Sequence, residues 1–332
     1  MIRYELRKIP FLLMIGTSLL TACSRDEGFS HEPDQDYRQE MRNFVIGLSK
    51  YAKQEKANFL ILPQNGIELV SQNEEPTGPP AEDYLNAIDG NGQEDLFFGY
   101  DGDDKATDQA ETNRLVKYLN ISKQAGNTIL VSDYCSTAKN ISDSYTWNQE
   151  RGFLCFAATE RELNIIPKVP VQYENKLNIQ KLSGAKNFLY LIKPSGFASK
   201  QTFIQAVTAT NYDVLIMNLY FSDGQAFTGQ ELSQLRKKAN GGSRLLISYM
   251  SIGEAEDYRP YWNASWQQNR PSWIVAENPD WRDNFKVMYW DKEWQSIIYG
   301  NDQSYLKKIL DAGFDGAYLD IIDAFNYFED LQ

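Results

Sequence analysis

The sequence predicts an α/β protein, a (β/α)8 TIM barrel, and three observations support this prediction. After residue 38, eight or nine short apolar segments alternate with helical or polar segments. Such alternating strand–helix units imply a parallel sheet with helices on its faces. Eight units in about 290 residues match the usual length of a (β/α)8 barrel. A doubly wound open sheet is the competing architecture, and the lack of a GxGxxG or P-loop motif disfavours it.

The apolar pattern places the expected elements in order along the chain. Apolar residues from Met41 to Ala52 recur at helical spacing and predict an amphipathic helix. A second helical pattern covers 111–126, and a third contains Leu306 and ends at Gly313. The expected strand-bearing segments are 58–66, 84–98, 128–135, 152–159, 187–196, 212–224, 243–259, 285–291 and 313–325.

Residues 1–23 have the pattern of a secretory signal, and residues 24–37 that of a flexible polar tether to a barrel over 38–332. Three basic residues precede an apolar run that is too short for a comfortable transmembrane helix. The run ends in LTAC, which resembles the lipobox of bacterial lipoproteins; an ordinary signal peptide is the alternative. The resemblance predicts an exported lipoprotein of the cell envelope, held at the membrane by a lipid on Cys23.

Composition excludes several classes of function. The chain has 33 basic and 45 acidic residues, and a net charge of −12 argues against a nucleic-acid partner. Its single histidine, His31, lies in the tether, so acid–base chemistry falls to carboxylates. Two interpretations of Cys135 and Cys155 stay open, a disulfide between them or two buried free thiols. Without a Cys/His cluster or a cofactor motif, no metal and no cofactor is expected.

Acids, amides and tyrosines follow most of the predicted strands. In a barrel these C-terminal strand ends converge on one face, where active sites are built. Acids that follow strands can equally serve as helix N-caps, and this second interpretation stays open for each single residue. The residues expected to bind substrate on this face are Gln64, Asn65, Asp133, Asn218, Tyr220, Tyr249 and Asp291. The pattern also includes Asp89, Glu94, Asp95 and Asp323.

Three acids are the candidate catalytic residues. Glu254 and Glu256 lie just beyond the predicted strand LLISYMS, and Asp320 ends the strand GAYL. Two carboxylates across a cleft are what glycoside hydrolysis requires. Six of the seven tryptophans fall between Trp262 and Trp294, where they can stack on sugar rings or fill the core.

Four segments resemble a known family. They are SYMSIGEAEDYRPYW (248–262), ENPDW (277–281), YWDKEWQ (289–295) and GFDGAYLDIIDAF (313–325). They resemble the TIM barrels of glycoside hydrolase family 114, whose characterised members are endo-α-1,4-polygalactosaminidases, and more closely its uncharacterised bacterial and archaeal branch. The resemblance implies that Glu256 is the family's acid/base or nucleophile. It also matches Glu254 and Asp320 to acids of the closer branch.

Two departures from the family qualify the resemblance. In the relatives the segment like YLDIIDAF precedes the segments like 38–135, whereas here it follows them. The chain is therefore predicted to be a circular permutant, which requires 316–322 to pair beside 59–64. The family's other proposed catalytic carboxylate corresponds best to Asn218. An amide cannot accept a proton or attack an anomeric carbon as a carboxylate can.

These observations support a first hypothesis and leave two alternatives. The first is a glycoside hydrolase that cleaves a polysaccharide, for which the acidic cleft favours a cationic, galactosamine-containing polymer. The second is a catalytically silent carbohydrate-binding lipoprotein. The third is a divalent-cation site, for which Asp133, Glu254, Asp320 and Asp323 offer hard oxygen ligands.

Overall fold

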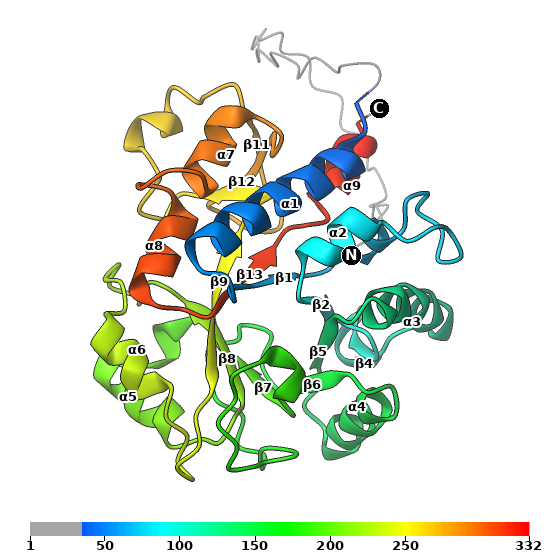
Figure 1. Ribbon diagram of the computed structural model, residues 1–332, viewed down its shortest axis with the longest axis vertical. Coiled ribbons are helices and arrows are strands. Elements are labelled where there is room, and N and C mark those ends of the chain that lie inside the picture. The colour runs from blue at the N-terminus through cyan, green and yellow to red at the C-terminus, as the bar shows by residue number, and fades with distance from the viewer. Residues whose placement is uncertain (1–34, 332) are drawn as a thin grey trace, which may run out of the picture.

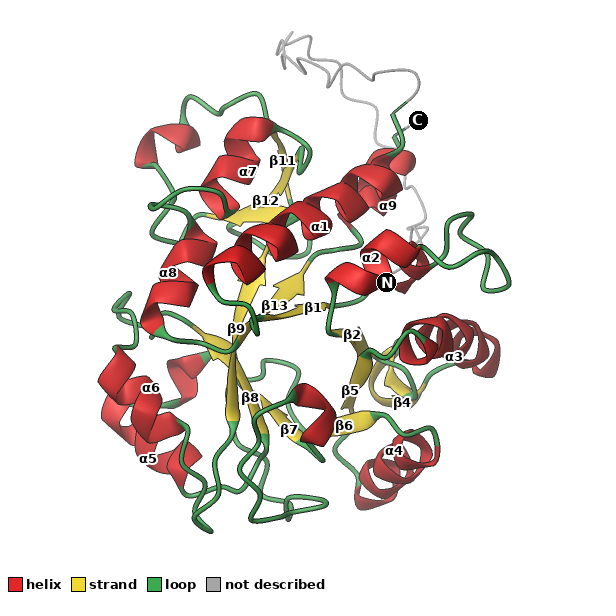
Figure 2. Cartoon of the chain, viewed as in Figure 1, coloured by secondary structure: helices red, strands yellow, loops and turns green. Residues whose placement is uncertain are grey.

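The computed structural model describes residues 35–331 as an α/β fold of parallel strands flanked by helices (Figure 1, Figure 2). The predicted signal, Cys23 and His31 lie outside the described residues. Between residues 35 and 331, no helix combines the length and the hydropathy needed to cross a membrane.

Eight strands within residues 35–331 pair in parallel, in two hydrogen-bonded sheets. The larger sheet has the order β1 (Leu60–Pro63), β13 (Gly316–Asp320), β9 (Leu245–Ser251), β8 (Val214–Asn218) and β7 (Phe188–Tyr190). The smaller has the order β2 (Gly90–Glu94), β5 (Thr128–Tyr134) and β6 (Leu154–Ala158).

The two sheets meet at both of their edges without forming one continuous ladder. A parallel bridge from Gln64 to Gly92 joins β1 to β2, and β6 contacts β7 without a ladder. The predicted α/β class and parallel pairing are confirmed, whereas no closed barrel is detected among the described strands.

Helices lie around the outside of these strands, as Figure 1 shows. The predicted helix from Met41 is confirmed within α1, where Phe44, Val45 and Leu48 are buried and Asp36 caps the first turn. The helices are α1 (Tyr37–Glu55), α2 (Glu82–Ala87), α3 (Gln109–Gln124), α4 (Ala138–Glu150), α5 (Lys200–Thr208), α6 (Gly229–Leu235), α7 (Lys292–Ile298), α8 (Tyr305–Ala312) and α9 (Ala324–Glu329).

Two small antiparallel sheets accompany the parallel strands. One pairs β3 (Phe98–Gly99) with β4 (Gly102–Ala106), and the other has the order β10 (Glu254–Glu256), β12 (Asn284–Val287), β11 (Ile274–Glu277). The strand-bearing segment 285–291 therefore does not join the parallel set. It contributes to β12, which pairs with β10 directly after β9 and places that antiparallel sheet beside the strand ends.

The pairing that a circular permutant requires is present. β1 and β13 are parallel neighbours, with Leu60 opposite Gly316 and Leu62 opposite Tyr318. The two ends of the described chain are also tied together, because Arg38 donates to both carboxylate oxygens of Glu329 at 2.8 and 2.9 Å. An unpermuted ring would also bring its first and last strands together, so the permutation stays a prediction.

The two cysteines of the described chain are free and buried. Cys135 follows β5 and Cys155 lies in β6, where its sulfur is 3.3 Å from the Ser144 hydroxyl. Of the two alternatives for these residues, the structure supports two buried thiols.

Candidate active site

A cavity of about 1030 Å³ lies where the parallel strands end. Eight of the ten residues that the sequence predicts for the site line it, and they come from the larger parallel sheet, the segments directly after its strands, and β10. These eight residues are Gln64, Asn65, Asn218, Tyr220, Tyr249, Glu254, Glu256 and Asp320. Their roles in catalysis and binding stay predictions, but the structure brings their side chains to one site.

Asp133 and Asp291 do not line the cavity, so the structure does not support their predicted role in binding. Asp133 is fully buried and accepts hydrogen bonds from the Phe97 amide at 2.8 Å and the Ser144 hydroxyl at 2.5 Å. It therefore ties β5 to the segment after β2 and to α4. Asp291 is the N-cap of α7 and accepts a hydrogen bond from the Glu293 amide at 2.7 Å. For Asp291 the capping interpretation is the correct one.

A guanidinium group holds Glu256 at one side of the cavity. Arg259 donates to its two carboxylate oxygens, Nε to Oε2 at 2.6 Å and Nη2 to Oε1 at 3.0 Å. Tyr258 adds a hydrogen bond to Oε1 at 2.5 Å. The same guanidinium donates to the Asn218 oxygen at 3.1 Å, and the Asn218 amide donates to the Ile192 carbonyl. Glu256 and Asn218 are therefore both part of one cationic clamp.

An ammonium group holds Glu254 in the same way. Because residues of a strand alternate in direction, Glu254 and Glu256 face the same side of β10. Lys286 of β12 lies opposite Glu254 in the ladder, and its Nζ is 2.7 Å from Glu254 Oε1. The Asn278 amide donates to the same oxygen at 2.8 Å. Burial raises the pKa of Glu254, and Lys286 opposes that effect.

Asp320 has no such cation. The Tyr249 hydroxyl donates to its Oδ2 at 2.6 Å, and the Ile321 amide donates to its Oδ1 at 2.8 Å. No lysine or arginine among residues 35–331 forms an ion pair with it. Enclosure by the protein, followed by the nearby charge of Glu94, raises the pKa of Asp320 to about 8. Both influences favour the protonated form of this carboxyl.

Glu94, at the end of β2, is a residue of the cavity that the sequence did not single out as catalytic. Gln64 Nε2 and Asn65 Nδ2 donate to its Oε2 at 2.5 and 3.1 Å, and the Tyr134 hydroxyl donates to its Oε1. Tyr190 in turn donates to Gln64 Oε1 at 2.7 Å. The side-chain amides of Gln64 and Asn65, which the sequence predicts to bind substrate, therefore orient Glu94.

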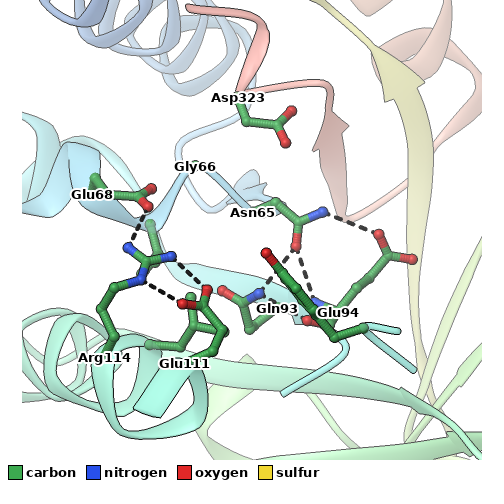
Figure 3. A pocket seen from close by; sticks show the side chains of 11 residues that line it. Asn65, Gly66, Glu68, Gln93, Glu94, Glu111, Arg114 and Asp323 are labelled. Atoms are coloured by element: carbon green, nitrogen blue, oxygen red, sulfur yellow. Dashed lines mark hydrogen bonds and ion pairs between the residues drawn. The ribbon is translucent and has the colours of Figure 1, made fainter. Parts of the chain in front are cut away.

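Figure 3 shows the amide of Asn65 directed at the Glu94 carboxylate. In the same view Asp323 points toward the pocket from another segment, while Arg114 is engaged by Glu68 and Glu111. Arg114 is thus directed to those two acids, at 2.6 and 2.7 Å, and within residues 35–331 it forms no ion pair with Glu94 or Asp323.

Asp95, which belongs to the strand-end pattern of the sequence, forms a further pair at the cavity with Arg161, which the sequence did not indicate. Arg161 Nη2 lies 3.1 Å from Asp95 Oδ1, and its guanidinium carbon is 3.9 Å from the centre of the Tyr134 ring. Burial and the charge of Glu94 raise the pKa of Asp95 to about 7, against the opposing effect of Arg161. The strand-end position of Asp95 was the signal for this residue, whereas Arg161 lies in a turn without a motif.

Most of the clustered tryptophans serve packing. Trp273 and Trp294 are fully buried, and Trp262 stacks on Phe285 with ring centres 4.8 Å apart. Trp281 differs, because it is 46% exposed and lines the cavity. The packing interpretation is therefore right for the first three, and Trp281 offers an aromatic face to a ligand.

The divalent-cation alternative receives no support from the geometry. Within the described part of the chain, no group of three or more His, Cys, Asp or Glu residues is placed to hold a metal ion. Asp133, one of its four proposed ligands, is directed at backbone amides and α4 instead.

Comparison with known proteins identifies the C-terminal part of the chain. Residues 187–332 match the model of glycoside-hydrolase family GH114. The resemblance predicted from the motifs is therefore confirmed for this region, which contains Asn218, Glu254, Glu256 and Asp320. Glu94 lies outside it.

Three relatives are uncharacterised proteins of prokaryotes. Uncharacterized protein MJ1477 of Methanocaldococcus jannaschii is 37% identical over 157 residues, 46% of this chain and 41% of the relative. A protein of Deinococcus radiodurans is 38% identical over 125 residues, 38% of each chain. One of Thermotoga maritima is 36% identical over 121 residues, 36% of each chain. The matching part of this chain thus spans less than half the length of each relative.

Proposed function

From the match of residues 187–332 to a glycoside-hydrolase family, we propose that this protein is a glycoside hydrolase that cleaves a polysaccharide in the cavity at the strand ends. One observation carries the proposal. Asp320 is a carboxyl group that lines the cavity, is held by the Tyr249 hydroxyl and forms no ion pair with the cations of residues 35–331, and its enclosure raises its pKa. Glycosidic cleavage requires such an acid together with a second carboxylate.

Asp320 is the proton donor in this proposal. It protonates the glycosidic oxygen as the bond from that oxygen to the anomeric carbon breaks, and the bonding electrons stay on the oxygen. Tyr249 holds the carboxyl in place through its hydroxyl. Glu254, Glu256 and Glu94 are the acids of the cavity that can supply the second carboxylate.

The charge of the cavity indicates a cationic sugar. Ten acidic residues and four basic residues line it, so the potential there favours a ligand with protonated amino groups. Trp281 and Tyr258, which are 46% and 60% exposed, provide faces for ring stacking at the edge. Polymers that contain galactosamine with free amino groups fit both features and are the first substrates to test.

The fold proposed for this enzyme is a closed, permuted (β/α)8 barrel. The bridge from Gln64 to Gly92 and the contact of β6 with β7 support a ring of the eight parallel strands. The adjacency of β1 and β13 supports a barrel opened after the strand that ends at Asp320. Such a ring would place all the strand-end acids on one face.

The proposed location is the cell envelope. The LTAC sequence that ends at Cys23 supports export and a lipid anchor, so the membrane and a polysaccharide are the partners. Labelling with a radioactive fatty acid in a bacterial host tests this point, because Cys23→Ser should abolish the incorporation that the native sequence gives.

A silent carbohydrate-binding protein is the second candidate, and one observation favours it. Asn218 stands where the family has a carboxylate, and it is hydrogen-bonded to Arg259 and to the Ile192 carbonyl. A site that had lost its second carboxylate would bind sugar without cleaving it.

One assay separates these two functions. The protein is incubated with partly deacetylated galactosaminogalactan and related amino-sugar polymers, and new reducing ends and bound polymer are both measured. We expect reducing ends from the wild type and a large loss in Asp320→Asn and in Glu256→Gln, the latter through the clamp. Binding without reducing ends would identify the silent protein, and neither binding nor cleavage would overturn both functions.

A further inference from the structure

We propose that Glu94 is the second carboxylate of this site and acts together with Asp320. This inference rests on the proposed function, and it moves the catalytic pair away from Glu254, Glu256 and the position of Asn218. The two acids end the strands on either side of β1, because β1 pairs with β13 and is bridged to β2.

A packing contact between Gly92 and Tyr318 relates the two strands that carry these acids. Gly92 lacks a side chain, and the space beside it holds the Tyr318 hydroxyl. Since side chains of a strand alternate, Glu94 faces the same side as Gly92, and Asp320 the same side as Tyr318. Glu94 and Asp320 thus each follow, by two residues on the same strand face, one member of a contacting pair, and both line the cavity.

Neutral groups alone hold this pair, within the described chain. Glu94 accepts hydrogen bonds from Gln64, Asn65 and Tyr134, and no lysine or arginine of residues 35–331 forms an ion pair with it. Neutral donors fix the position of a carboxylate without cancelling its charge. Glu256 and Glu254, in contrast, direct their charge at Arg259 and Lys286.

The two acids also influence one another electrostatically. After burial, the charge of Glu94 is the largest influence that raises the pKa of Asp320. The other groups that act on Asp320 are Tyr249, the Ile321 amide and Asp323. Two neighbouring acids, of which one has its pKa raised by the other, are the arrangement that two-carboxylate catalysis uses.

The chemistry balances with water as the only co-substrate. Asp320 gives its proton to the glycosidic oxygen, which leaves with the bonding electrons. With water as the nucleophile, Glu94 takes a proton as the water oxygen bonds to the anomeric carbon. With Glu94 as the nucleophile, its oxygen forms that bond, and water later replaces it with Asp320 as the base. Both routes consume one water molecule and regenerate both carboxyl groups after proton exchange with solvent.

The kinetic test compares neighbouring acids of one loop. Glu94→Gln keeps the shape of the side chain and should lower kcat at least about 100-fold with little change in KM. Asp95→Asn removes an acid that is paired with Arg161, and it should lower kcat less than about tenfold. Circular dichroism and urea midpoints check that both variants fold. Glu94→Gln with more than a tenth of wild-type kcat would overturn the inference alone, while the proposed function would stand.

A chemical rescue distinguishes a reacting carboxylate from a structural one. Glu94→Ala leaves room for azide, which bonds to the anomeric carbon while Asp320 still protonates the leaving oxygen. We expect azide to restore cleavage and to yield a glycosyl azide. Glu256→Ala, the matched variant, should show no rescue. Rescue of Glu256→Ala in place of Glu94→Ala would overturn the inference.

A titration tests the coupling of the pair without a substrate. In protein labelled with carbon-13 at aspartate carboxyl groups, Glu94→Gln should lower the pKa of Asp320, whereas Glu256→Gln should leave it nearly unchanged. An unchanged Asp320 titration in Glu94→Gln would overturn the inference. A wild type that cleaves no polymer would instead overturn the proposed function, and the inference with it.

Discussion

The acids on the two sides of the cavity have different kinds of partners, cations on one side and neutral groups on the other. On the side of β10, Glu254 and Glu256 are buried against Lys286 and Arg259. On the side of β2 and β13, Glu94 and Asp320 are held by amide and hydroxyl groups. A buried ion pair fixes geometry and cancels charge, whereas an acid held by neutral groups keeps its capacity to exchange a proton. In the proposed mechanism the conspicuous GEAED motif therefore builds the wall of the site, and the less conspicuous ends of β2 and β13 supply the reacting acids.

The largest effect is expected from removing the proton donor. Asp320→Asn should lower the rate on natural polymer by about 10²- to 10⁴-fold, because an amide cannot donate the proton. Aryl glycosides with good leaving groups need less protonation and should lose less activity. Equal losses on both substrate types, measured by initial rates, would contradict a donor role.

The next effect concerns the cationic clamp. Arg259→Met leaves Glu256 buried without its partner and should lower the free energy of unfolding by about 3–5 kcal/mol in urea titrations. The double variant with Glu256→Gln should recover part of that loss. Lys286→Met should cost less, because its ammonium is more exposed than the guanidinium of Arg259. A loss below about 1 kcal/mol for Arg259→Met would show that the clamp is not stabilising.

The pH dependence of stability tests whether Asp320, which lacks a cationic partner, has a raised pKa. Because the pKa of Asp320 is raised to about 8, the folded protein binds more protons than the unfolded chain between about pH 4 and about pH 8. The free energy of unfolding should therefore fall as the pH rises through this range. Asp320→Asn should remove part of this dependence, so that its stability relative to wild type grows with pH. Parallel curves for the two proteins would refute the raised pKa.

A smaller effect is expected from the hydroxyl that holds Asp320. Tyr249→Phe removes a hydrogen bond that lowers the pKa of Asp320. The variant should lose about tenfold in kcat, and the alkaline limb of its pH–rate profile should move to higher pH. A movement of that limb to lower pH would count against the proposed contact.

The smallest effect is expected at the corrected residue Asp291. Asp291→Ala removes the N-cap of α7 and should cost about 1 kcal/mol of stability while kcat and KM stay unchanged. A selective rise in KM would restore Asp291 to the binding site.

The sequence predicts the site well because parallel strands end on one face. Strand ends alone place Asn218, Tyr249, Asp320 and the acids of β10 around one cavity. Asp133 does not line the cavity, because side chains alternate along a strand and Tyr134, the next residue, faces the cavity instead. The strand pattern of the sequence did not indicate which of the two residues faces inward.

Glu94 is harder to select from the sequence. It ends the strand GNGQE, which has no apolar run, and Gly92 of this strand lies against Tyr318. It also lies outside the region that matches the family. The ion pair of Glu254 depends on the register of β10 with β12, which joins residues 32 apart in sequence. Of the two ion pairs on β10, the one between Glu256 and Arg259 joins residues three apart, so its spacing in the sequence is short enough to indicate it.

The measurement that tests this account most directly is the titration of Asp320 in the wild-type protein. Carbon-13 spectra of aspartate carboxyl groups, assigned with Asp320→Asn, follow each group from about pH 3 to about pH 10. The account predicts that Asp320 loses its proton only near pH 8, as its enclosure and the charge of Glu94 require. An Asp320 that is fully ionised at about pH 6 would contradict the account.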